Sequence, residues 1–353
     1  MNRAPQCAGG SPRARLCGLV LCLLACVIPA SARSKPLAHF YAVNEPSSWD
    51  SLRANAAHIE LLSPRWFVLG PQLELESSVD AQVVDWARKH RLRLMPLLTN
   101  SDFEASIVHS LLQDEDQRKK LAAGLAQVCA DNGFWGMQLD LENVPADDRD
   151  AYTAFARDLA GALRRRKCKL SIAVPAPLQP AAAPAPATQW IPSPVAAGFD
   201  YRELGKIADF VSLMAYDEHV TEPGPIAGLP WVEACLKAVL PMVPAKKLSL
   251  GAALYYRRWE RQSSGKYSVT EGAYGDALQL AVQQSSRPQW DADQQELRAA
   301  GPDTGGTVMW ISSADSLRQR IELAKRYRLQ GFSAWRLGQE DPAVWEVLAR
   351  AGR

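Results

Sequence analysis

Eight short runs of apolar and β-branched residues recur along the chain, and each is closed by polar residues or glycine. Runs of this kind are typical of strands that are buried on both faces of a parallel sheet. The predicted strands span residues 39–44, 60–69, 92–99, 134–142, 169–175, 209–217, 247–256 and 331–337.

Most of these strands are separated by segments in which apolar residues return at every third or fourth position, as in a helix. The predicted helices span residues 47–58, 79–90, 121–129, 147–166, 230–243 and 316–329. Eight alternating β and α units in one chain favour a (β/α)8 barrel. An open doubly wound sheet is the second choice, and the lack of a glycine-rich loop after the first strand counts against a dinucleotide-binding version.

Two stretches interrupt the alternation. Residues 175–198 are rich in proline and alanine, and we expect an extended loop because a strand precedes them and the β/α pattern resumes afterwards. Residues 258–310 lie between the seventh and eighth strands and contain KYSV, a helical segment near 273–284 and TVMWI. They predict a small α+β insertion.

The N-terminus has the pattern of a secretory signal. Residues 1–15 carry only positive charge, residues 16–28 are apolar, and Ala30-Ser31-Ala32 offers a small-x-small cleavage site. We therefore expect a signal peptide over 1–32, cleavage near Ala32, a barrel over 33–353, and a secreted or periplasmic protein without a membrane span. Two alternatives are an uncleaved anchor and lipidation of Cys26, which ends a lipoprotein-like Leu-Leu-Ala-Cys box.

Charge and cysteine content narrow the partners. The chain has 40 basic and 38 acidic residues, so it has no bulk attraction to nucleic acid, and we expect a monomer. Cys129, Cys168 and Cys235 remain after the leader, in no zinc-binding spacing, and we expect neither a metal site nor a cofactor. Cys129 near a helix end and Cys168 just before the fifth strand both fall at the amino-terminal face of adjacent units, which makes them the predicted disulfide pair.

Candidate chemistry lies at the carboxyl ends of the strands, where barrels of this type carry their working residues. The fourth strand ends in QLDLE, and alternation turns Gln138, Asp140 and Glu142 into the barrel. Two adjacent inward carboxyls raise each other's pKa and favour sharing one proton, which suits a general acid beside an ionised partner. The alternative is a structural pair satisfied by backbone amides or exposed beyond the strand end.

Further candidates close the other strands. Tyr216 on the sixth strand could donate its hydroxyl to a carbonyl, and Trp335 on the eighth offers a flat apolar surface for a sugar ring. His219 could act as a base or as a hydrogen-bonded structural group. The remaining candidates on this rim are Tyr41, Asn44, Met214 and Asp217. For each aromatic residue the alternative is ordinary core packing.

The D-x-E of the fourth strand, the M-x-Y-D of the sixth and the Trp of the eighth, with an α+β insertion before it, resemble glycoside hydrolase family 18. The segments GPIAG (224–228), followed by Trp231, and WRLGQEDPAVW (335–345) are similar to bacterial members with motifs of the spore-cortex-enzyme type. The resemblance spans about residues 38–350, with the motifs in the expected order on the strands.

This resemblance implies a retaining glycosidase in which the C2 acetamido group of the sugar is the nucleophile. Glu142 would be the general acid and base, Asp140 would orient the acetamido group, and Tyr216 would donate to its carbonyl oxygen. Asp217 would hold the sugar and Trp335 would form the floor beneath it. Met214, Tyr41 and Gln138 complete the substrate-binding set that we expect. The substrate would be a β-linked N-acetylglucosamine polymer, such as peptidoglycan, a chitin-like chain or poly-N-acetylglucosamine.

The sequence departs from the family pattern at two positions before Asp140. Gln138 and Trp135 stand where the family motif has acids, and Gln138 can form a hydrogen bond to Asp140 but cannot take its proton. An alternative function is therefore a carbohydrate-binding barrel of the cell envelope with weak or no hydrolysis. The presence of Glu142 favours an enzyme, because lectin-like members of the family usually lack that acid. A scaffold in an envelope assembly has only the export signal in its favour.

Overall fold

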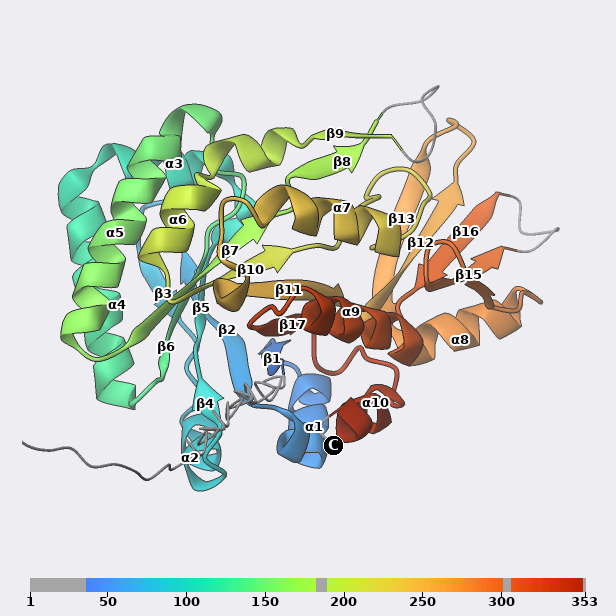
Figure 1. Cartoon of the computed structure of the whole chain (residues 1–353), viewed down its shortest axis with the longest axis horizontal. Coiled ribbons are helices and arrows are strands. Elements are labelled where there is room, and N and C mark those ends of the chain that lie inside the picture. The colour runs from blue at the N-terminus through green and yellow to red at the C-terminus, as the bar shows by residue number, and fades with distance from the viewer. Residues whose placement is uncertain (1–35, 182–188, 301–305, 352–353) are drawn as a thin grey trace, which may run out of the picture. The chain divides into compact units, whose positions relative to one another are not determined.

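Parallel strands close into a barrel in the computed structural model, which describes residues 36–181, 189–300 and 306–351. The strand at each position around the barrel pairs with both neighbours, and β1 closes the ring by pairing with β2 and with the last strand, β17 (Figure 1). The barrel strands are β1 (Leu37–Ala42), β2 (Leu61–Leu69), β4 (Arg93–Leu94) with β5 (Leu97–Asn100), β6 (Gly136–Asp140), β7 (Lys169–Pro175), β10 (Phe210–Met214), β11 (Leu248–Ala253) and β17 (Gly331–Trp335). The predicted (β/α)8 barrel is confirmed.

Each barrel position corresponds to one predicted strand. The third is split into β4 and β5 at Pro96, because proline has no N–H for the ladder. A short strand that was not predicted, β3 (Leu75–Ser77), pairs antiparallel with the far end of β2.

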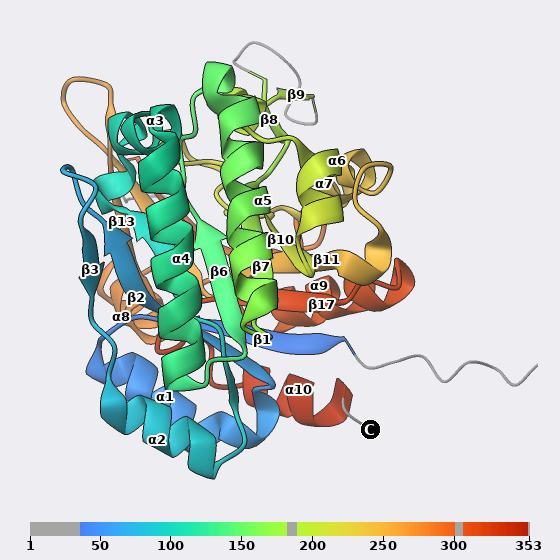
Figure 2. The ribbon, with the colours of Figure 1, turned by 90° about the vertical axis from the view of Figure 1, so that its left-hand side faces the viewer.

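Helices surround the barrel, and Figure 2 shows α4 and α5 lying side by side outside β6 and β7. The helices of the barrel units are α1 (Pro46–Asn55), α2 (Ala81–Lys89), α3 (Ala105–Gln113), α4 (Glu115–Asn132), α5 (Arg149–Arg165), α6 (Tyr201–Ile207), α7 (Leu229–Val239), α9 (Ala314–Arg326) and α10 (Val344–Ala351). The helices α3, α6 and α10 were not predicted; α6 and α10 are only seven and eight residues long, which leaves few turns for an apolar period to show.

Local sequence signals fix several helix ends. Asp80, Asp114 and Ser313 accept hydrogen bonds from backbone N–H groups in the first turns of α2, α4 and α9, which satisfies donors that the helix leaves free. Gly133 ends α4 in the left-handed region at φ 66°, a conformation that costs glycine little. The chain can therefore turn directly into β6, the strand that carries the carboxyl pair.

The insertion before β17 is an antiparallel sheet with one helix (Figure 1). It comprises β12 (Tyr255–Arg261), β13 (Tyr267–Ala273), α8 (Tyr274–Gln283), β14 (Gln289–Asp291), β15 (Glu296–Ala300) and β16 (Thr307–Ile311). The predicted seventh strand, 247–256, was wrong at its end, because it ran past Ala253 into β12. The residues around the junction, Ala252 to Tyr256, are all apolar or aromatic, so the strand boundary shows only in the change of pairing partner.

The proline- and alanine-rich segment was expected to be an extended loop, and its described part forms a hairpin. In it β8 (Leu178–Pro180) pairs with β9 (Trp190–Pro192), and the Trp231 indole on α7 donates to the Leu178 carbonyl oxygen. The predicted leader, residues 1–32 with the cleavage site at Ala32 and with Cys26, lies outside the described residues.

The predicted disulfide is confirmed. Cys129 in the last turn of α4 is bonded to Cys168 just before β7, with 6.7 Å between their Cα atoms, and Cys235 is a buried free thiol. The bond joins two neighbouring units at the amino-terminal end of the barrel, away from the strand ends that carry the candidate chemistry.

We expect the Cys129–Cys168 bond to stabilise the fold, because it restricts the unfolded chain. Replacing both cysteines by alanine should lower the free energy of unfolding by about 2–4 kcal/mol, measured by chemical denaturation. Cys235→Ala is the control, since its stability should still fall when reductant is added, whereas the double variant should not respond. A double variant as stable as the oxidised protein would contradict the prediction.

Candidate active site

A cleft of about 1230 Å³ opens at the carboxyl ends of the barrel strands. This is the end at which barrels of this class carry out their chemistry. Seven of the candidate side chains named from the sequence line it together: Asp140, Glu142, Met214, Tyr216, Asp217, His219 and Trp335. They come from the ends of β6, β10 and β17, so closure of the barrel is what assembles them.

The two carboxyls at the end of β6 share a buried environment. Asp140 is 6% exposed, and its Oδ1 atom has no hydrogen-bond partner within the described residues. Burial raises the pKa of Asp140 and of Glu142, and the charge of Asp140 raises that of Glu142 further. The Arg65 guanidinium opposes both shifts. Desolvation is thus the largest cause for both carboxyls, the charge of Asp140 adds to it at Glu142, and the net effect favours the protonated form of each.

The backbone of Glu142 is held by a residue that the sequence analysis missed. The Asn100 side chain, at the end of β5, accepts from the Glu142 N–H at 2.9 Å and donates to the Glu142 carbonyl oxygen at 3.3 Å. Next to it, Asn143 adopts φ 54° and donates to the Phe103 carbonyl oxygen. Because β6 ends at Asp140, the backbone of Glu142 has no strand hydrogen bonds. The contacts of Asn100 and Asn143 replace them, and they hold the backbone from which the Glu142 side chain projects.

A fully buried polar chain lies beneath the carboxyls. The Gln138 amide donates to the Tyr41 hydroxyl at 2.8 Å, and its oxygen accepts from Ser63 at 3.5 Å. Ser63 lies 2.7 Å from Nε2 of His39, and burial lowers the pKa of His39 to about 3, so the ring is neutral. Since the Ser63 hydroxyl gives its hydrogen to Gln138, the tautomer with the hydrogen on Nε2 is the one that completes this contact. Along this chain each group donates a hydrogen bond to the next, from His39 to Ser63, to Gln138 and to Tyr41. The side chain at position 138 must therefore both accept and donate, which an amide can do.

This arrangement corrects two expectations. Gln138 does not bond to Asp140, because its amide is already engaged by Ser63 and Tyr41 one layer below. Gln138 and Tyr41 were also expected to bind substrate, but they are 0% and 3% exposed and do not line the cleft. Tyr41 instead supports the floor from below, with its ring centroid 5.5 Å from that of Trp335.

Tyr216, two residues after the end of β10, and Trp335, at the end of β17, both line the cleft. Both pack against the same apolar cluster. Burial raises the pKa of Tyr216 well above its usual range, and the neighbouring acids raise it further, so its hydroxyl keeps its proton and can donate. Met214 lies on the same strand face, two residues earlier. The cleft therefore combines an aromatic floor, a hydroxyl donor and a protonated carboxyl.

The insertion supplies one wall and clamps Asp217. The Tyr255 hydroxyl and the Arg257 guanidinium, both on β12, donate to Oδ1 of Asp217, the latter at 2.6 Å. Arg257 is 3% exposed and also bonds Glu271 on β13 and the His219 carbonyl oxygen. Tyr255 and Arg257 were not predicted as site residues, because position 255 was assigned to the end of the barrel strand 247–256 and position 257 fell between that strand and the predicted insertion, 258–310.

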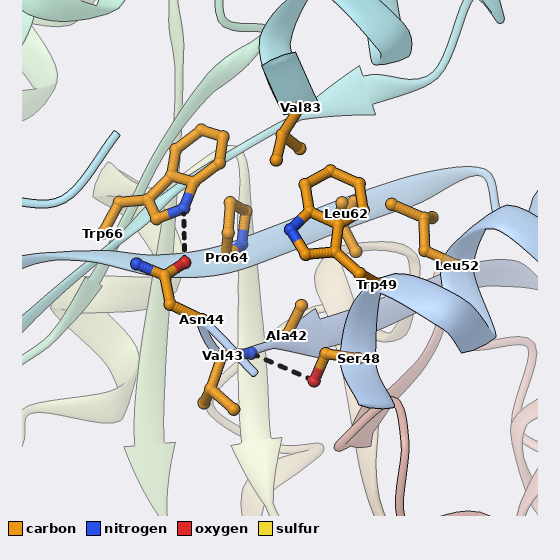
Figure 3. A pocket seen from close by; sticks show the side chains of 10 residues that line it. All are labelled: Ala42, Val43, Asn44, Ser48, Trp49, Leu52, Leu62, Pro64, Trp66 and Val83. Atoms are coloured by element: carbon orange, nitrogen blue, oxygen red, sulfur yellow. Dashed lines mark hydrogen bonds between the residues drawn. The ribbon is translucent and has the colours of Figure 1, made fainter. Parts of the chain in front are cut away.

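The remaining candidates have structural contacts. His219 lines the cleft, with Nδ1 3.1 Å from the Pro225 carbonyl oxygen, and burial lowers its pKa. Asn44, expected on the rim, accepts from the Trp66 indole and donates to the Ser78 carbonyl oxygen. Figure 3 shows it beside a cavity of about 10 Å³ between β1, β2, α1 and α2, with Trp49 and Trp66 on its wall. That space holds about one water molecule and cannot hold a sugar.

In residues 36–181, 189–300 and 306–351, no group of three or more His, Cys, Asp or Glu side chains is arranged to hold a metal ion. What the geometry offers is general acid catalysis by a buried carboxyl, with a second carboxyl oxygen free to accept a hydrogen bond. Such a site suits cleavage of a glycosidic bond on an aromatic floor.

Fold and site together define a barrel of the glycosidase class. Residues 77–340 match the family Glycosyl hydrolases family 18, and the chain belongs to that family. Its activity class is accordingly that of a glycosidase.

Named relatives agree with this assignment. The chain is 22% identical to the uncharacterized glycosylase YvbX of Bacillus subtilis over 88% of its own length and 90% of that protein. It is 27% identical to the cortical fragment-lytic enzyme of B. subtilis over 72% of its length, but it spans only 59% of that protein. The structure of a chitinase from Chromobacterium violaceum superimposes with a TM-score of 0.78 at 24% identity, over 90% of this chain and 98% of that one.

Gln138→Asp should change the pH dependence of catalysis rather than the fold. A carboxyl in place of this amide would couple its titration to that of Asp140, one pleat away, and we expect the active pH range on an N-acetylglucosamine oligomer to widen. The measurement is kcat/KM against pH, with melting temperature recorded alongside. Gln138→Asn is the matched control, because it has the length of Asp without its charge. Identical profiles for the two variants would show that position 138 takes no part in proton handling.

Proposed function

We propose that this protein is a secreted glycosidase that cleaves β-linked N-acetylglucosamine polymers with retention of configuration. One observation carries the proposal: in this cleft burial raises the pKa of Glu142, and beside it Asp140 has a buried carboxyl oxygen without a hydrogen-bond partner among the described residues. A single acid would suit many hydrolases. An acid beside a free hydrogen-bond acceptor suits a sugar whose own acetamido N–H must be held while the glycosidic bond breaks.

The proposed reaction has two steps. In the first, Glu142 gives its proton to the glycosidic oxygen, the bond from that oxygen to C1 breaks, and the acetamido oxygen bonds to C1. Asp140 accepts from the acetamido N–H, Tyr216 donates to the acetamido oxygen, and Trp335 supports the ring. In the second, Glu142 takes a proton from water as its oxygen attacks C1, and the acetamido group is released.

Asp217 and Met214 are proposed to contact the sugar beside the reacting centre. The clamp from Tyr255 and Arg257 holds Asp217 in one orientation, so that one of its oxygens remains for a sugar hydroxyl. We propose Gln138 and Tyr41 as supporting groups, since they lie under the cleft floor.

A second function, sugar binding without efficient hydrolysis, is favoured by one observation. Gln138 is locked between Ser63 and Tyr41 and cannot exchange a proton with Asp140, as the family's acid at this position would. A fixed amide could slow the turning of Asp140 toward the acetamido group, and measured turnover on oligomers decides between the two functions.

The location of the protein is part of the proposal. The leader pattern over residues 1–32 supports export, by cleavage near Ala32 or by lipidation at Cys26, and we propose a monomer acting outside the cytoplasm. Within the described ranges, the helices are all too short or too polar to span a bilayer.

Glu142→Gln should abolish most hydrolysis while preserving sugar binding. Glutamine has nearly the same shape but no proton to give, and we expect turnover to fall on the order of 10²–10⁴-fold. The melting temperature at neutral pH should not fall, because the folded state raises the pKa of Glu142 and so disfavours its charged form. Unchanged turnover on every cleaved polymer would rule out this residue as the acid.

The pH profile of the wild type should be displaced upward from that of exposed carboxyls. Glu142 must be protonated to act, and burial raises its pKa, so the alkaline limb of kcat/KM should lie at or above neutral pH. The acidic limb should reflect protonation of Asp140. Disappearance of the alkaline limb in Glu142→Gln, measured on its residual activity, would identify the group. An alkaline limb at the usual pH of an exposed carboxyl would contradict the prediction.

A further inference from the structure

Arg65 is a cleft residue to which neither the reaction proposed above nor the clamp on Asp217 assigns a role. It lies on β2, faces the cleft and is part of its lining. Its Nε donates to the Thr99 hydroxyl at 3.3 Å, and its guanidinium carbon lies 5.6 Å from the centroid of the Phe103 ring. The group is thus fixed in orientation from two sides, by a buried hydroxyl and by an aromatic face.

The terminal nitrogens of Arg65 have no partner among the described residues. Its one side-chain hydrogen bond uses Nε, and it takes part in no ion pair there. Among the described residues its one side-chain hydrogen bond goes to Thr99 and none goes to Asp140, whose Oδ1 atom is also without a partner. It lines the same cleft as Asp140 and Glu142, and its charge lowers the pKa of both carboxyls. Its free donors therefore face the space that a bound sugar chain would occupy.

No other lining residue that the structure describes offers a free positive charge. The only other basic side chain in the lining is His219, whose pKa burial lowers and whose Nδ1 is engaged by a carbonyl oxygen. Arg257, behind the wall, is shared between Asp217 and Glu271. A cationic group left free among carboxyls selects for a negative group on the ligand.

We propose that Arg65 binds a carboxylate carried by the polysaccharide beside the cleaved bond. The planar guanidinium matches a carboxylate with two parallel hydrogen bonds, which a sugar hydroxyl cannot provide. Among N-acetylglucosamine polymers, chitin has no carboxylate, whereas peptidoglycan carries a lactyl ether on every second sugar. This inference rests on the proposed function and narrows it to strands whose lactyl carboxylate is free of peptide.

The test compares kcat/KM on three substrates of equal length: peptide-free peptidoglycan strands, the same strands with the lactyl carboxyl converted to a methylamide, and chitin oligomers. Arg65→Gln should reduce the preference for the carboxylate strands over the methylamide strands on the order of 10- to 100-fold. The readout is the ratio of the two, because any effect of Arg65 on the pKa of the carboxyl pair acts on both substrates alike. Arg65→Lys should retain part of the preference, and added salt should weaken it in the wild type.

Arg93→Gln is the matched control. Arg93 also lies over an aromatic ring, with its guanidinium carbon 5.1 Å from the Trp135 centroid, but it is on β4 and does not line the cleft. Its removal should leave the ratio unchanged. An unchanged ratio in Arg65→Gln would overturn the inference while leaving the proposed function intact.

Binding measured by calorimetry makes the test independent of turnover. In a Glu142→Gln background, Arg65→Gln should weaken binding of peptide-free strands and leave the methylamide strands at their lower affinity. Strands that still carry their peptides are a fourth ligand in this experiment. If Arg65→Gln weakens the binding of these strands only, the carboxylate that Arg65 binds belongs to the peptide, and the lactyl assignment is overturned. Failure of the wild type to cleave any of the three substrates would instead refute the proposed function.

Discussion

Placing two carboxyls on successive inward positions at the end of one buried strand is the constraint on which the rest of this structure depends. Desolvation disfavours their charged forms, so Asp140 and Glu142 hold a proton that exposed acids would have lost. A glycosidase needs such a proton for general acid catalysis. The carboxyls keep it only if the scaffold holds both of them buried and in a fixed orientation. The closed barrel provides this, because it has no edge through which β6 could relax toward solvent.

The surroundings of the pair fall into three layers with different tasks. Below it, the chain from His39 through Ser63 and Gln138 to Tyr41 fills the barrel with neutral polar groups. Beside it, Asn100 holds the backbone of Glu142 on both sides. Across from it, the insertion holds Asp217. The layer below carries no charge at neutral pH, so it supports the pair without adding a further cost of buried charge.

The insertion is bound into the barrel by a second set of buried charges. Glu296 on β15 accepts from the backbone N–H groups of Ile226 and Ala227, and Arg320 on α9 reaches both Glu296 and the Ala227 carbonyl oxygen. Glu218 accepts from Gly228 in the same loop. These contacts give the GPIAG segment (224–228) a structural role, because its backbone N–H groups bind the Glu296 carboxylate of the insertion. The loop carrying Asp217 is therefore fixed at both of its ends.

The sequence was sufficient for the barrel, for the inward direction of Asp140 and Glu142 and for the Cys129–Cys168 pair. The direction of the carboxyls follows from alternation, which is local in the chain, and the disulfide pair follows from the rule that successive β/α units lie next to each other in such a barrel. Tertiary structure alone decided that Gln138 bonds to Tyr41 and not to Asp140, that Asn100 holds Glu142, and that Tyr255 and Arg257 reach Asp217. Each of these contacts joins residues from different strands or from the loops that follow them, and its existence depends on register and side-chain direction. Alternation shows which face a side chain takes, but it does not show which of several polar neighbours on that face will satisfy it.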